Sequence, residues 1–542
     1  MSLLDIENLH VLLGDLPILK GISLAINPGE IVGLVGESGS GKSMTALSVM
    51  KLLPHGMTAT GRVNLNGVDI LAAPETAMNR LRGAEIAMVF QEPMTALNPL
   101  KTIGEQVAEG IRWHTGANRP DAEAHARAIL DRVGLPESRF PLNRYPHELS
   151  GGQRQRVVIA MACAMKPKLL IADEPTTALD VVIQAQILDL LRELVEEQQM
   201  GLLLISHDLA VVAQLADRIT IVRHGEVMDS GPATEILREQ RHPYTRQLAE
   251  ASMHVPARAK VPEIAPEAEP LLEVKNVSRH YPLRRTSLFG PRRSFAAVQD
   301  VSFSMHQKQS VTLVGRSGCG KSTLARMILA LDRPTAGSVF FRGTDLADCT
   351  EPELKEIRRD LQVVFQDPYG SFNPRHRVER LVGEPLHLLG KRLSAREKRD
   401  RVAEALEQVG LSPADLDKYP HEFSGGQRQR LSIARAIITR PKLIVADEPV
   451  SALDVSIRAQ ILDLFAELNS RLGLAYLFIT HDLTVARAIC DVTMVMHEGR
   501  IVERGPTEDV LVSPKTEPAR ALVAAAPDLT QALNRRLQGT RA

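Results

Sequence analysis

Two copies of one glycine-rich loop carry the clearest chemistry in this sequence. Residues 36–43 read GESGSGKS and residues 315–322 read GRSGCGKS, and each copy follows an apolar run and precedes a helix-forming run. Glycines let successive backbone N–H groups turn inward around phosphate oxygens, and the helix that follows adds the positive end of its dipole. The pattern therefore predicts two sites for a nucleoside triphosphate. The residues predicted to bind it are Gly36, Ser38, Gly39, Gly41, Lys42 and Ser43 in the first loop, and Gly315, Ser317, Gly318, Gly320, Lys321 and Ser322 in the second.

The lysine and the serine that end each loop have separate predicted tasks. The ammonium groups of Lys42 and Lys321 would contact the β- and γ-phosphates, and the hydroxyls of Ser43 and Ser322 would be ligands of Mg²⁺.

Two pairs of acidic residues end apolar runs further along the chain. LLIADEP contains Asp173 and Glu174, and LIVADEP contains Asp447 and Glu448. A buried strand that ends in Asp places its carboxylate at the edge of the sheet where α/β proteins bind ligands. Asp173 and Asp447 are therefore predicted to hold Mg²⁺, directly or through water. The neighbouring glutamates are predicted to orient or deprotonate an attacking water. One such pair alone could be a solvated loop.

A histidine follows another apolar run in each half of the chain, in GLLLISHD (His207) and in LAYLFITHD (His481). An imidazole at such a strand end could contact a γ-phosphate and respond to its loss, whereas a lone histidine after a strand is more often structural. The repetition favours the functional interpretation.

The whole set of motifs occurs twice in one order. SGGQRQR begins at residue 150 and again at residue 424, and the acidic pairs and the histidines are also 274 positions apart. This indicates a tandem duplication of a unit of roughly 250 residues, much longer than a solenoid repeat. Residues 255–270 lie between the units and contain four prolines, which favours an extended linker. The predicted domains are residues 1–254 and 271–542, joined by this linker.

Two further segments differ from the repeat. Residues 282–296 form a basic insertion in the second unit only, which could touch lipid headgroups or form a solvated hairpin tip. The tail from Ser513 is rich in Ala, Pro and charge, and we expect its end to be mobile.

Composition restricts the partners of the chain. Lys+Arg and Asp+Glu both number 65, and this balance does not favour nucleic acid. No apolar run reaches the ~18 residues of a membrane span, and the N-terminal stretch does not resemble a secretion signal, so any membrane role is expected to come through a partner. The four cysteines are too few and too scattered for a disulfide framework or a paired-cysteine metal site.

The motifs taken together resemble the nucleotide-binding domains of ABC ATPases. They are the phosphate loop, a Gln after VF, LSGGQ or FSGGQ, the acidic pair, ALD and the His. The resemblance covers nearly the whole chain. It implies an α/β fold of two tandem P-loop NTPase domains, each with a RecA-like core, an α-helical subdomain and an antiparallel β subdomain. It also implies ATP and Mg²⁺ as cofactors, with Gln91 and Gln366 both as metal ligands and as catalytic residues beside Glu174, Glu448, His207 and His481.

The duplicated SGGQ has a physical reason within this family. A helix that opens at Ser150–Gly152 and runs through roughly Met165 presents free N–H groups and a positive dipole end to an anion. In ABC ATPases this helix end comes from the opposite domain, so the two domains pair head to tail within one chain. The resemblance thus assigns Ser424, Gly425, Gly426 and Gln427 to the ATP on Lys42, and Ser150, Gly151, Gly152 and Gln153 to the ATP on Lys321. ALD at residues 178–180 and 452–454 would cross the same interface.

Finer features resemble the peptide/nickel importer branch of the family. They are QEPMTALNP and QDPYGSFNP after the two glutamines, and HPYT at residues 242–245. The resemblance implies an energy-coupling ATPase at the cytoplasmic face of the inner membrane. Its partners would be two permease subunits that dock near the Gln-loops and, indirectly, an extracytoplasmic solute-binding protein, with no nucleic acid. The alternative is a non-transport tandem ABC ATPase that acts on ribosomes or nucleic acid. The solute stays open among peptides, glutathione-like compounds, nickel, opines and glycosides.

The chain departs from the family pattern at three places. Family members stack adenine on an aromatic residue before the phosphate loop, which Tyr281 supplies in the second unit, whereas the first unit has Leu13 there and His10 nearby. Such a stack contributes ~1–3 kcal/mol, so the first site is expected to bind nucleotide more weakly or to discriminate less between bases, unless His10 substitutes. No cysteine cluster follows Cys490, so no iron–sulfur cofactor is expected. Cys319 lies inside the second phosphate loop, where it could be sensitive to alkylation or merely a small residue.

Overall fold

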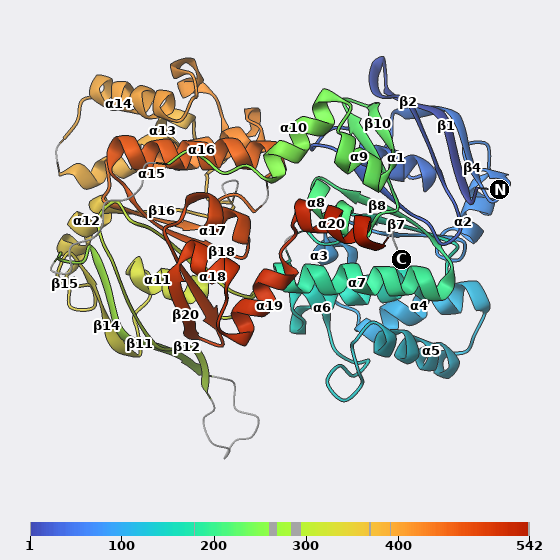
Figure 1. Cartoon of the computed structure of the whole chain (residues 1–542), viewed down its shortest axis with the longest axis horizontal. Helices are drawn as coiled ribbons and strands as arrows, with labels where there is room; N and C mark the ends of the chain where they lie inside the picture. Colours follow the sequence, from blue (N-terminus) through green and yellow to red (C-terminus); the bar gives the residue numbers. More distant parts are fainter. Residues whose placement is uncertain are drawn as a thin grey trace.

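The computed structural model describes residues 2–177, 179–258, 268–282, 294–367, 370–390, 392–451 and 453–539. Figure 1 shows them as two lobes side by side, the first built from the blue and green part of the chain and the second from the yellow to red part. Most of the predicted linker and of the basic insertion 282–296 lies outside the described residues. Among the described residues, no helix has both the length and the apolar character needed to cross a bilayer.

The centre of each lobe is a six-stranded sheet in which five strands are parallel and one edge strand is antiparallel. The strand order is β10-β9-β3-β8-β7-β6 in the first lobe and β16-β17-β18-β13-β19-β20 in the second. Apolar runs without alternation form these strands, because both faces of a parallel sheet are covered. The strands of the first sheet are β3 (Ile31–Val35), β6 (Ile86–Val89), β7 (Leu169–Asp173), β8 (Gly201–Ser206), β9 (Arg218–Arg223) and β10 (Glu226–Pro232). Those of the second are β13 (Ser310–Val314), β16 (Leu361–Val364), β17 (Leu443–Asp447), β18 (Ala475–Thr480), β19 (Val492–His497) and β20 (Arg500–Pro506).

A smaller antiparallel sheet packs over each central sheet and buries one face against it. The orders are β2-β1-β4-β5 and β12-β11-β14-β15. Their strands are β1 (Leu4–Leu13), β2 (Leu16–Ile26), β4 (Met57–Leu65) and β5 (Val68–Asp69), then β11 (Leu272–Pro282), β12 (Ser294–Met305), β14 (Ala336–Phe341) and β15 (Thr344–Asp345).

Each lobe also contains a helical subdomain. It lies between the edge strand β6 and strand β7 in the first lobe, and between the edge strand β16 and strand β17 in the second. Its first copy contains α3 (Pro93–Ala96), α4 (Ile103–Thr115), α5 (Arg119–Arg132), the 3-10 turn η1 (Pro146–Glu148) and α6 (Gly151–Cys163). Its second copy contains α13 (Val378–Gly383), η2 (Glu384–Leu389), α14 (Ala395–Gln408), η3 (Pro413–Asp417), η4 (Pro420–Glu422) and α15 (Gly425–Ile437). The helix predicted to run from Gly151 to about Met165 ends at Cys163, so its start was correct and its end was two residues too long.

The remaining helices flank the central sheets. In the first lobe they are α1 (Lys42–Val49), α2 (Glu75–Leu81), α7 (Val181–Gln198), α8 (Leu209–Leu215), α9 (Ala233–Glu239) and α10 (Pro243–Ser252). In the second they are α11 (Lys321–Ile328), α12 (Glu351–Asp360), α16 (Val455–Leu472), α17 (Leu483–Ile489) and α18 (Thr507–Val512). This arrangement is the predicted fold: two tandem P-loop NTPase domains, each with a parallel core, a helical subdomain and an antiparallel β subdomain.

The C-terminal extensions of the two lobes cross over to each other. Helix α10 of the first lobe packs against α16 of the second, and His254, just after α10, lies 2.7 Å from Asp463 of α16. In return, α19 (Glu517–Ala525) packs against α7, and α20 (Leu529–Gly539) packs against α8 and α9. Figure 1 shows α20 in red inside the green lobe.

The tail therefore differs from its sequence-based expectation. Its end was expected to be mobile, but Leu529 and Ala532 of α20 are buried in the core of the first lobe, and Arg536 donates a hydrogen bond to the carbonyl of Ala213. Composition missed this packing because the apolar face of α20 meets its partner more than 300 positions away. Residues 540–542 lie outside the described residues.

Candidate nucleotide-binding and hydrolytic sites

The two phosphate loops have the same backbone turn. Gly41 and Gly320 precede α1 and α11 with φ of 103° and 110°, a region that side chains disfavour. A Cβ atom on Gly320 would lie 2.3 Å from the carbonyl oxygen of Ala297, so only glycine fits there. The turn brings the N-terminus of the following helix to the end of the central strand, as the sequence predicted.

A buried ammonium lies within each loop. Lys42 Nζ donates to the carbonyl oxygens of Gly36 at 2.7 Å and Glu37 at 3.0 Å. Lys321 Nζ makes the same bonds to Gly315 and Arg316, at 2.7 and 3.1 Å. Burial lowers the pKa of Lys42, while the charge of Glu174 acts in the opposite direction. A cation beside a helix N-terminus is a suitable partner for phosphate oxygens.

The acidic pairs end β7 and β17, where the parallel strands finish. Glu174 and Glu448 both have φ of 47°, an unusual conformation for a residue other than glycine. Their backbone N–H groups donate to the carbonyls of Ile205 and Ile479 on the neighbouring strand, at 3.0 and 2.8 Å. This left-handed turn directs consecutive carboxylates to different places, which is consistent with separate metal and water-activating roles.

The predicted Gln, Glu and His of each domain meet. Gln91 Nε2 donates to Glu174 Oε2 at 2.9 Å, and His207 Nδ1 lies 3.3 Å from Glu174 Oε1. In the second domain the distances are 2.7 Å from Gln366 to Glu448 and 3.0 Å from His481 Nδ1 to Glu448.

Hydrogen bonding keeps both glutamates ionised. Burial opposes the charge on Glu174, but bonds from His207 and Thr177 together with the charge of Lys42 outweigh it and lower the pKa of Glu174 to about 2. Burial likewise opposes the charge on Glu448, and His481 outweighs it and lowers the pKa of Glu448. Burial also favours neutral His481, yet Glu448 raises the pKa of that imidazole. Thr177, whose hydroxyl donates to Glu174 at 2.9 Å, was not predicted from sequence.

Asp173 and Asp447 provide the place that fits a divalent cation. Asp173 is buried, and its Oδ1 has no hydrogen-bond partner among the described residues. The hydroxyl of Ser43 is hydrogen-bonded to the same carboxylate, and Ser322 is bonded to Asp447. Burial and the neighbouring charge of Glu448 raise the pKa of Asp447 to about 6. A buried carboxylate that has one oxygen without a partner and lies beside a serine hydroxyl suits Mg²⁺.

Each SGGQ opens a helix with a reciprocal cap. Ser150 Oγ accepts from the N–H of Gln153 at 3.4 Å, and the Gln153 side chain accepts from the N–H of Ser150 at 2.9 Å. Ser424 and Gln427 repeat the pair. A Cβ on Gly152 would lie 2.5 Å from Ile183 in α7, so this glycine lets the start of α6 pack closely on the start of α7.

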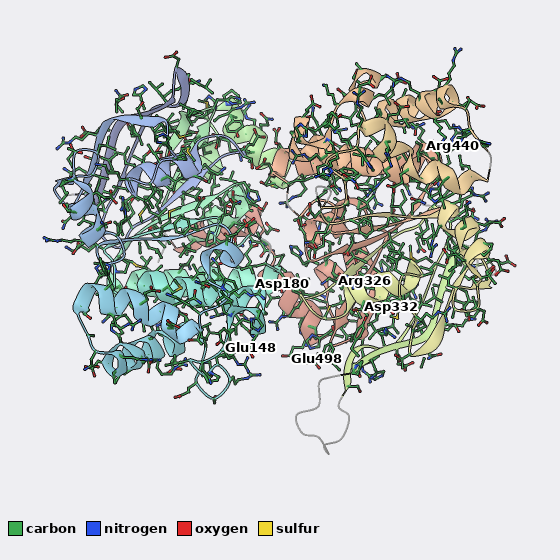
Figure 2. The ribbon with its side chains drawn as sticks, turned by 180° about the vertical axis from the view of Figure 1, so that it is seen from behind. Glu148, Asp180, Arg326, Asp332, Arg440 and Glu498 are labelled. Atoms are coloured by element: carbon green, nitrogen blue, oxygen red, sulfur yellow. The ribbon has the colours of Figure 1, made fainter. Side chains whose placement is uncertain are left out.

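The start of α7 in turn contacts the other domain. One carboxylate oxygen of Asp180 caps α7 by accepting from the N–H of Ile183, and the other accepts from the N–H of Ser317 at 3.0 Å. Asp454 accepts from the N–H and the hydroxyl of Ser38, at 2.9 and 3.0 Å. Figure 2 shows Asp180 at the junction of the two lobes. The pairing is thus head to tail, with the start of α7 or α16 against the opposite phosphate loop. Ala178 and Ala452, the first residues of the ALD motifs, lie outside the described residues.

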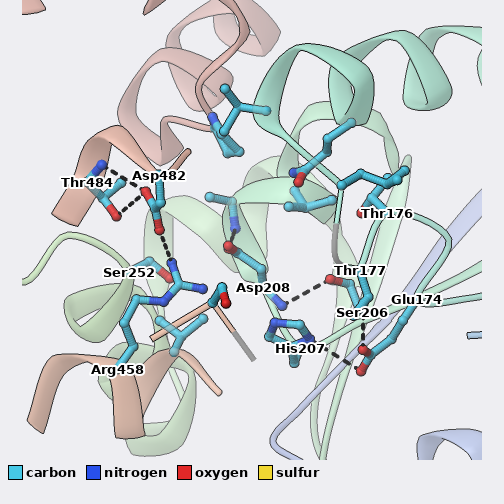
Figure 3. A pocket seen from close by; sticks show the side chains of 18 of the residues that line it. Glu174, Thr176, Thr177, Ser206, His207, Asp208, Ser252, Arg458, Asp482 and Thr484 are labelled. Atoms are coloured by element: carbon cyan, nitrogen blue, oxygen red, sulfur yellow. Dashed lines mark hydrogen bonds and ion pairs between the residues drawn. The ribbon is translucent and has the colours of Figure 1, made fainter. Parts of the chain in front are cut away.

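A cavity of about 90 Å³ lies between the two domains. Glu174 and His207 of the first domain and His481 of the second line it. Arg458 of α16 reaches into it and pairs with Asp482 at 2.9 Å (Figure 3). The first domain has Gln184 and Asp208 at the matching positions and so lacks this ion pair. The pair was not predicted from sequence, because Arg458 belongs to no motif, although Asp482 directly follows the motif histidine His481.

The predicted adenine contacts differ between the domains. Tyr281 lies near the end of β11, where its hydroxyl donates to Asp332 at 2.9 Å and Arg279 stacks over its ring at 4.8 Å. Leu13 ends β1 and is 43% exposed, and His10 is bonded to Asn8 at 3.1 Å. Leu13 has no ring that could stack on a base, and the imidazole of His10 stays the alternative, so the expected weaker first site stays a prediction.

Comparisons with known proteins show what the chain is similar to. A family model described as "ABC transporter" matches residues 19–177 and 298–451, and one described as "Oligopeptide/dipeptide transporter, C-terminal region" matches residues 228–295. The glutathione import ATP-binding protein GsiA of Salmonella paratyphi A is 44% identical over 94% of this chain and 86% of its own length. The protein of the same name from Escherichia coli O157:H7 is 43% identical over 97% of this chain and 90% of its own length. The solved dimer of the ATP-binding cassette MJ0796 with ADP and phosphate is 30% identical over 44% of this chain and 98% of its own, with a TM-score of 0.39.

Proposed function

Since this chain belongs to the ABC transporter family as an ATP-binding protein, we propose that ATP held between its two domains closes them head to tail and that hydrolysis reopens them. The chain is an ATPase that couples energy to import, and its relatives are import ATP-binding proteins of the peptide type. The observation that carries the closure model is the reciprocal bonding of Asp180 to Ser317 and of Asp454 to Ser38. This family membership favours transport over the alternative of a ribosome- or nucleic-acid-directed ATPase.

We propose the following roles for the site residues. The phosphate-loop N–H groups with Lys42 or Lys321 bind the triphosphate, and the SGGQ turn of the opposite domain completes each site. Ser43, Asp173 and the amide oxygen of Gln91 would hold Mg²⁺ in the first domain, with Ser322, Asp447 and Gln366 in the second. The ion would neutralise charge on the β- and γ-phosphates.

The catalytic step rests on residues of this chain. Glu174 and Glu448 are ionised at neutral pH and accept hydrogen bonds from the histidine and the glutamine of their own domain. A carboxylate held in this way can orient a water and take its proton. His207 or His481, which lies beside the same carboxylate, would contact the γ-phosphate.

We further propose that the permease docks beside the Gln-loops. A groove of about 840 Å³ lies between α12 and η2 of the second domain, next to Gln366. Leu331 and Phe365 are exposed in it, at 58% and 38%, and Lys355 and Arg358 lie at its rim. Glu351 and Glu384 also line the groove, and Arg358 is paired with Glu351. An apolar floor with a rim of mixed charge fits a short amphipathic cytoplasmic helix. The chain would thereby lie peripherally on the cytoplasmic face of the inner membrane.

The domain division 1–254, 255–270 and 271–542 remains our proposal. We add that α20 completes the core of the first domain although it belongs to the second in sequence, while α19 packs between the two domains. The solute is proposed to be a small peptide of the size of glutathione, because the relatives at 43–44% identity are named for glutathione import. The solute would be selected by the permease and the binding protein.

The test is to co-purify the full chain with its two permease subunits, place the complex in proteoliposomes and measure ATP hydrolysis. Binding protein loaded with glutathione is expected to stimulate hydrolysis above unloaded binding protein, and Ni²⁺ or a dipeptide serves as comparison. The double variant Glu174→Gln, Glu448→Gln is the inactive control. A chain that sediments with ribosomes and shows no stimulation by any loaded binding protein would contradict the proposal.

A further inference from the structure

The first phosphate loop has a contact that the second lacks. The hydroxyl of Tyr244, in α10, accepts a hydrogen bond from the backbone N–H of Glu37 at 3.3 Å. Tyr244 is only 2% exposed. A residue of the C-terminal extension therefore holds the second residue of the GESGSGKS loop by its main chain.

Tyr244 is itself fixed from several sides. Arg223 stacks over its ring at 4.6 Å, and the N–H of Tyr244 donates to the His242 side chain at 3.1 Å. The next residue, Thr245, is fully buried and donates to Asp229 at 2.9 Å. The HPYT segment thus forms a rigid support for the tyrosine hydroxyl, and the same helix packs against α16 of the other domain.

Glu37 is also held from across the domain interface. The hydroxyl of Ser456, in the first turn of α16, donates to the Glu37 carboxylate. Glu37 therefore joins Tyr244 of its own domain to Ser456 of the opposite domain, directly beside the Asp454–Ser38 contact.

The second site has none of these three residues. Counting from the matching motifs, Arg316 stands where the first loop has Glu37, and Val182 stands where the second domain has Ser456. The hydroxyl of Thr516 donates to Glu503, which matches the bond from Thr245 to Asp229 in the first domain. The residue before Thr516 is Lys515, which therefore takes the place of Tyr244 and is exposed. The difference between the sites is therefore built from three positions that change together.

We infer that Tyr244 is a positioning residue for the first nucleotide site, which holds Glu37 so that Ser456 of the other domain can bind it. The inference rests on the proposed function of the Lys42 loop. A loop that must aim several N–H groups at a phosphate binds more tightly when its backbone is already ordered. The first site is thereby preorganised by α10 and by domain closure together, whereas the second loop shares the interdomain contact, through Asp180, but has no matching tyrosine at Lys515.

The test measures the Kd for Mg²⁺–ATP with a fluorescent ATP analogue on full-length chains in two backgrounds. Lys321→Ala leaves only the first site, and Lys42→Ala leaves only the second. Tyr244→Phe is expected to raise Kd about three- to tenfold in the first background, the effect of one net hydrogen bond, and less than twofold in the second. Tyr476→Phe is the control, because that buried hydroxyl has no partner among the described residues.

Two further variants separate positioning from stability. Ser456→Ala is expected to weaken the first site in the same direction, and its counterpart Val182→Ala to leave that site unchanged. Because Tyr244 and Ser456 act through one residue, Glu37, the double variant should raise Kd by less than the product of the single effects. Equal effects of Tyr244→Phe in both backgrounds, or a lowered melting temperature with unchanged Kd, overturn the inference. If the Lys42→Ala chain still binds two nucleotides, the proposed nucleotide site at Lys42 is wrong, irrespective of the effect of Tyr244→Phe.

Discussion

The carboxylate of Asp180 accepts a hydrogen bond from the backbone N–H of Ser317 at 3.0 Å, although the two residues are 137 positions apart and in different domains. The same carboxylate caps α7, whose first turn packs on Gly152 of SGGQ. Asp180 thus connects the start of α7, which packs on the SGGQ turn of the first domain, to the phosphate loop of the second. Asp454 and Ser38 make the reciprocal connection, so each site depends on both halves of the chain.

Both domains retain the full hydrolytic set, so we expect two competent sites. Glu174→Gln alone should leave measurable ATP hydrolysis from the second site, and Glu448→Gln alone should leave that of the first. The double variant should lose at least ~100-fold, since general-base catalysis contributes ~10²–10⁴-fold. Steady-state phosphate release checks this, and nucleotide binding is the control for folding. Complete loss of turnover in either single variant, with binding intact, would mean that the sites are unequal or strictly coupled.

The raised pKa of Asp447 predicts that the free energy of unfolding depends on pH in the absence of Mg²⁺ and nucleotide. Burial and Glu448 raise its pKa to about 6, above the ~3.9 of an unfolded chain, so the folded state holds this proton more tightly. The native chain therefore loses stability as pH rises from about 4 to 6, by up to ~3 kcal/mol at ~1.4 kcal/mol per unit.

Asp447→Asn removes that penalty, so the variant should resist urea better than the native chain at pH 7.5 and equally at pH 4. The exposed Asp189→Asn in the first domain is the matched control. Urea denaturation midpoints across this pH range measure the effect. A variant that is less stable than the native chain at pH 7.5 without Mg²⁺ would refute the assignment.

Helix α20 should stabilise the domain that it packs on rather than the domain that precedes it in sequence. Leu529 is 6% exposed and lies in the core of the first domain. Leu529→Ala should lower the stability of the first domain by ~2–3 kcal/mol, the usual effect of removing a buried leucine side chain. Asn534→Ala, at an exposed position of the same helix, should have little effect. Hydrogen exchange of α8 and α9 reports the change locally, and unchanged protection there in Leu529→Ala would disprove the docking of α20.

Cys319 should react slowly with thiol reagents despite its place in a phosphate loop. Burial raises its pKa, and the charge of Lys321 offsets this only in part, so little thiolate is present at neutral pH. The structure thus favours a small packing residue over a reactive thiol. Alkylation followed by mass spectrometry should modify Cys349 first, because Cys349 is partly exposed while the other three cysteines are buried. Rapid inactivation that ATP prevents and Cys319→Ser abolishes would show the opposite.

Local motifs were enough to predict the fold and the groups that meet within one domain. The glycines around Lys42 and the acids after β7 work through turns and strand ends, which depend on neighbouring residues, so the sequence marks them directly. The helix start at Ser150 was predictable for the same reason, because its cap comes from Gln153 three residues later.

Contacts between distant segments were not predictable in this way. Tyr244 was marked by HPYT, but nothing in the sequence says that its hydroxyl reaches Glu37, 207 positions away. The Arg458–Asp482 pair and the docking of α20 belong to the same class. Each depends on how two folded units pack, and short apolar faces or single charges carry no signal about their partner.

The most direct measurement of the composite sites uses chains with one functional phosphate loop. In Lys42→Ala, only the second site turns over, and Asp180 serves that site. Adding Asp180→Ser, which can still cap α7 but is too short to reach Ser317, should lower the remaining ATP hydrolysis about tenfold, the effect of a charged hydrogen bond. Adding Asp454→Ser to the same chain should change hydrolysis less than twofold. If Asp454→Ser is the damaging change in this background and Asp180→Ser is silent, or if both act equally, the head-to-tail account of the two sites is wrong.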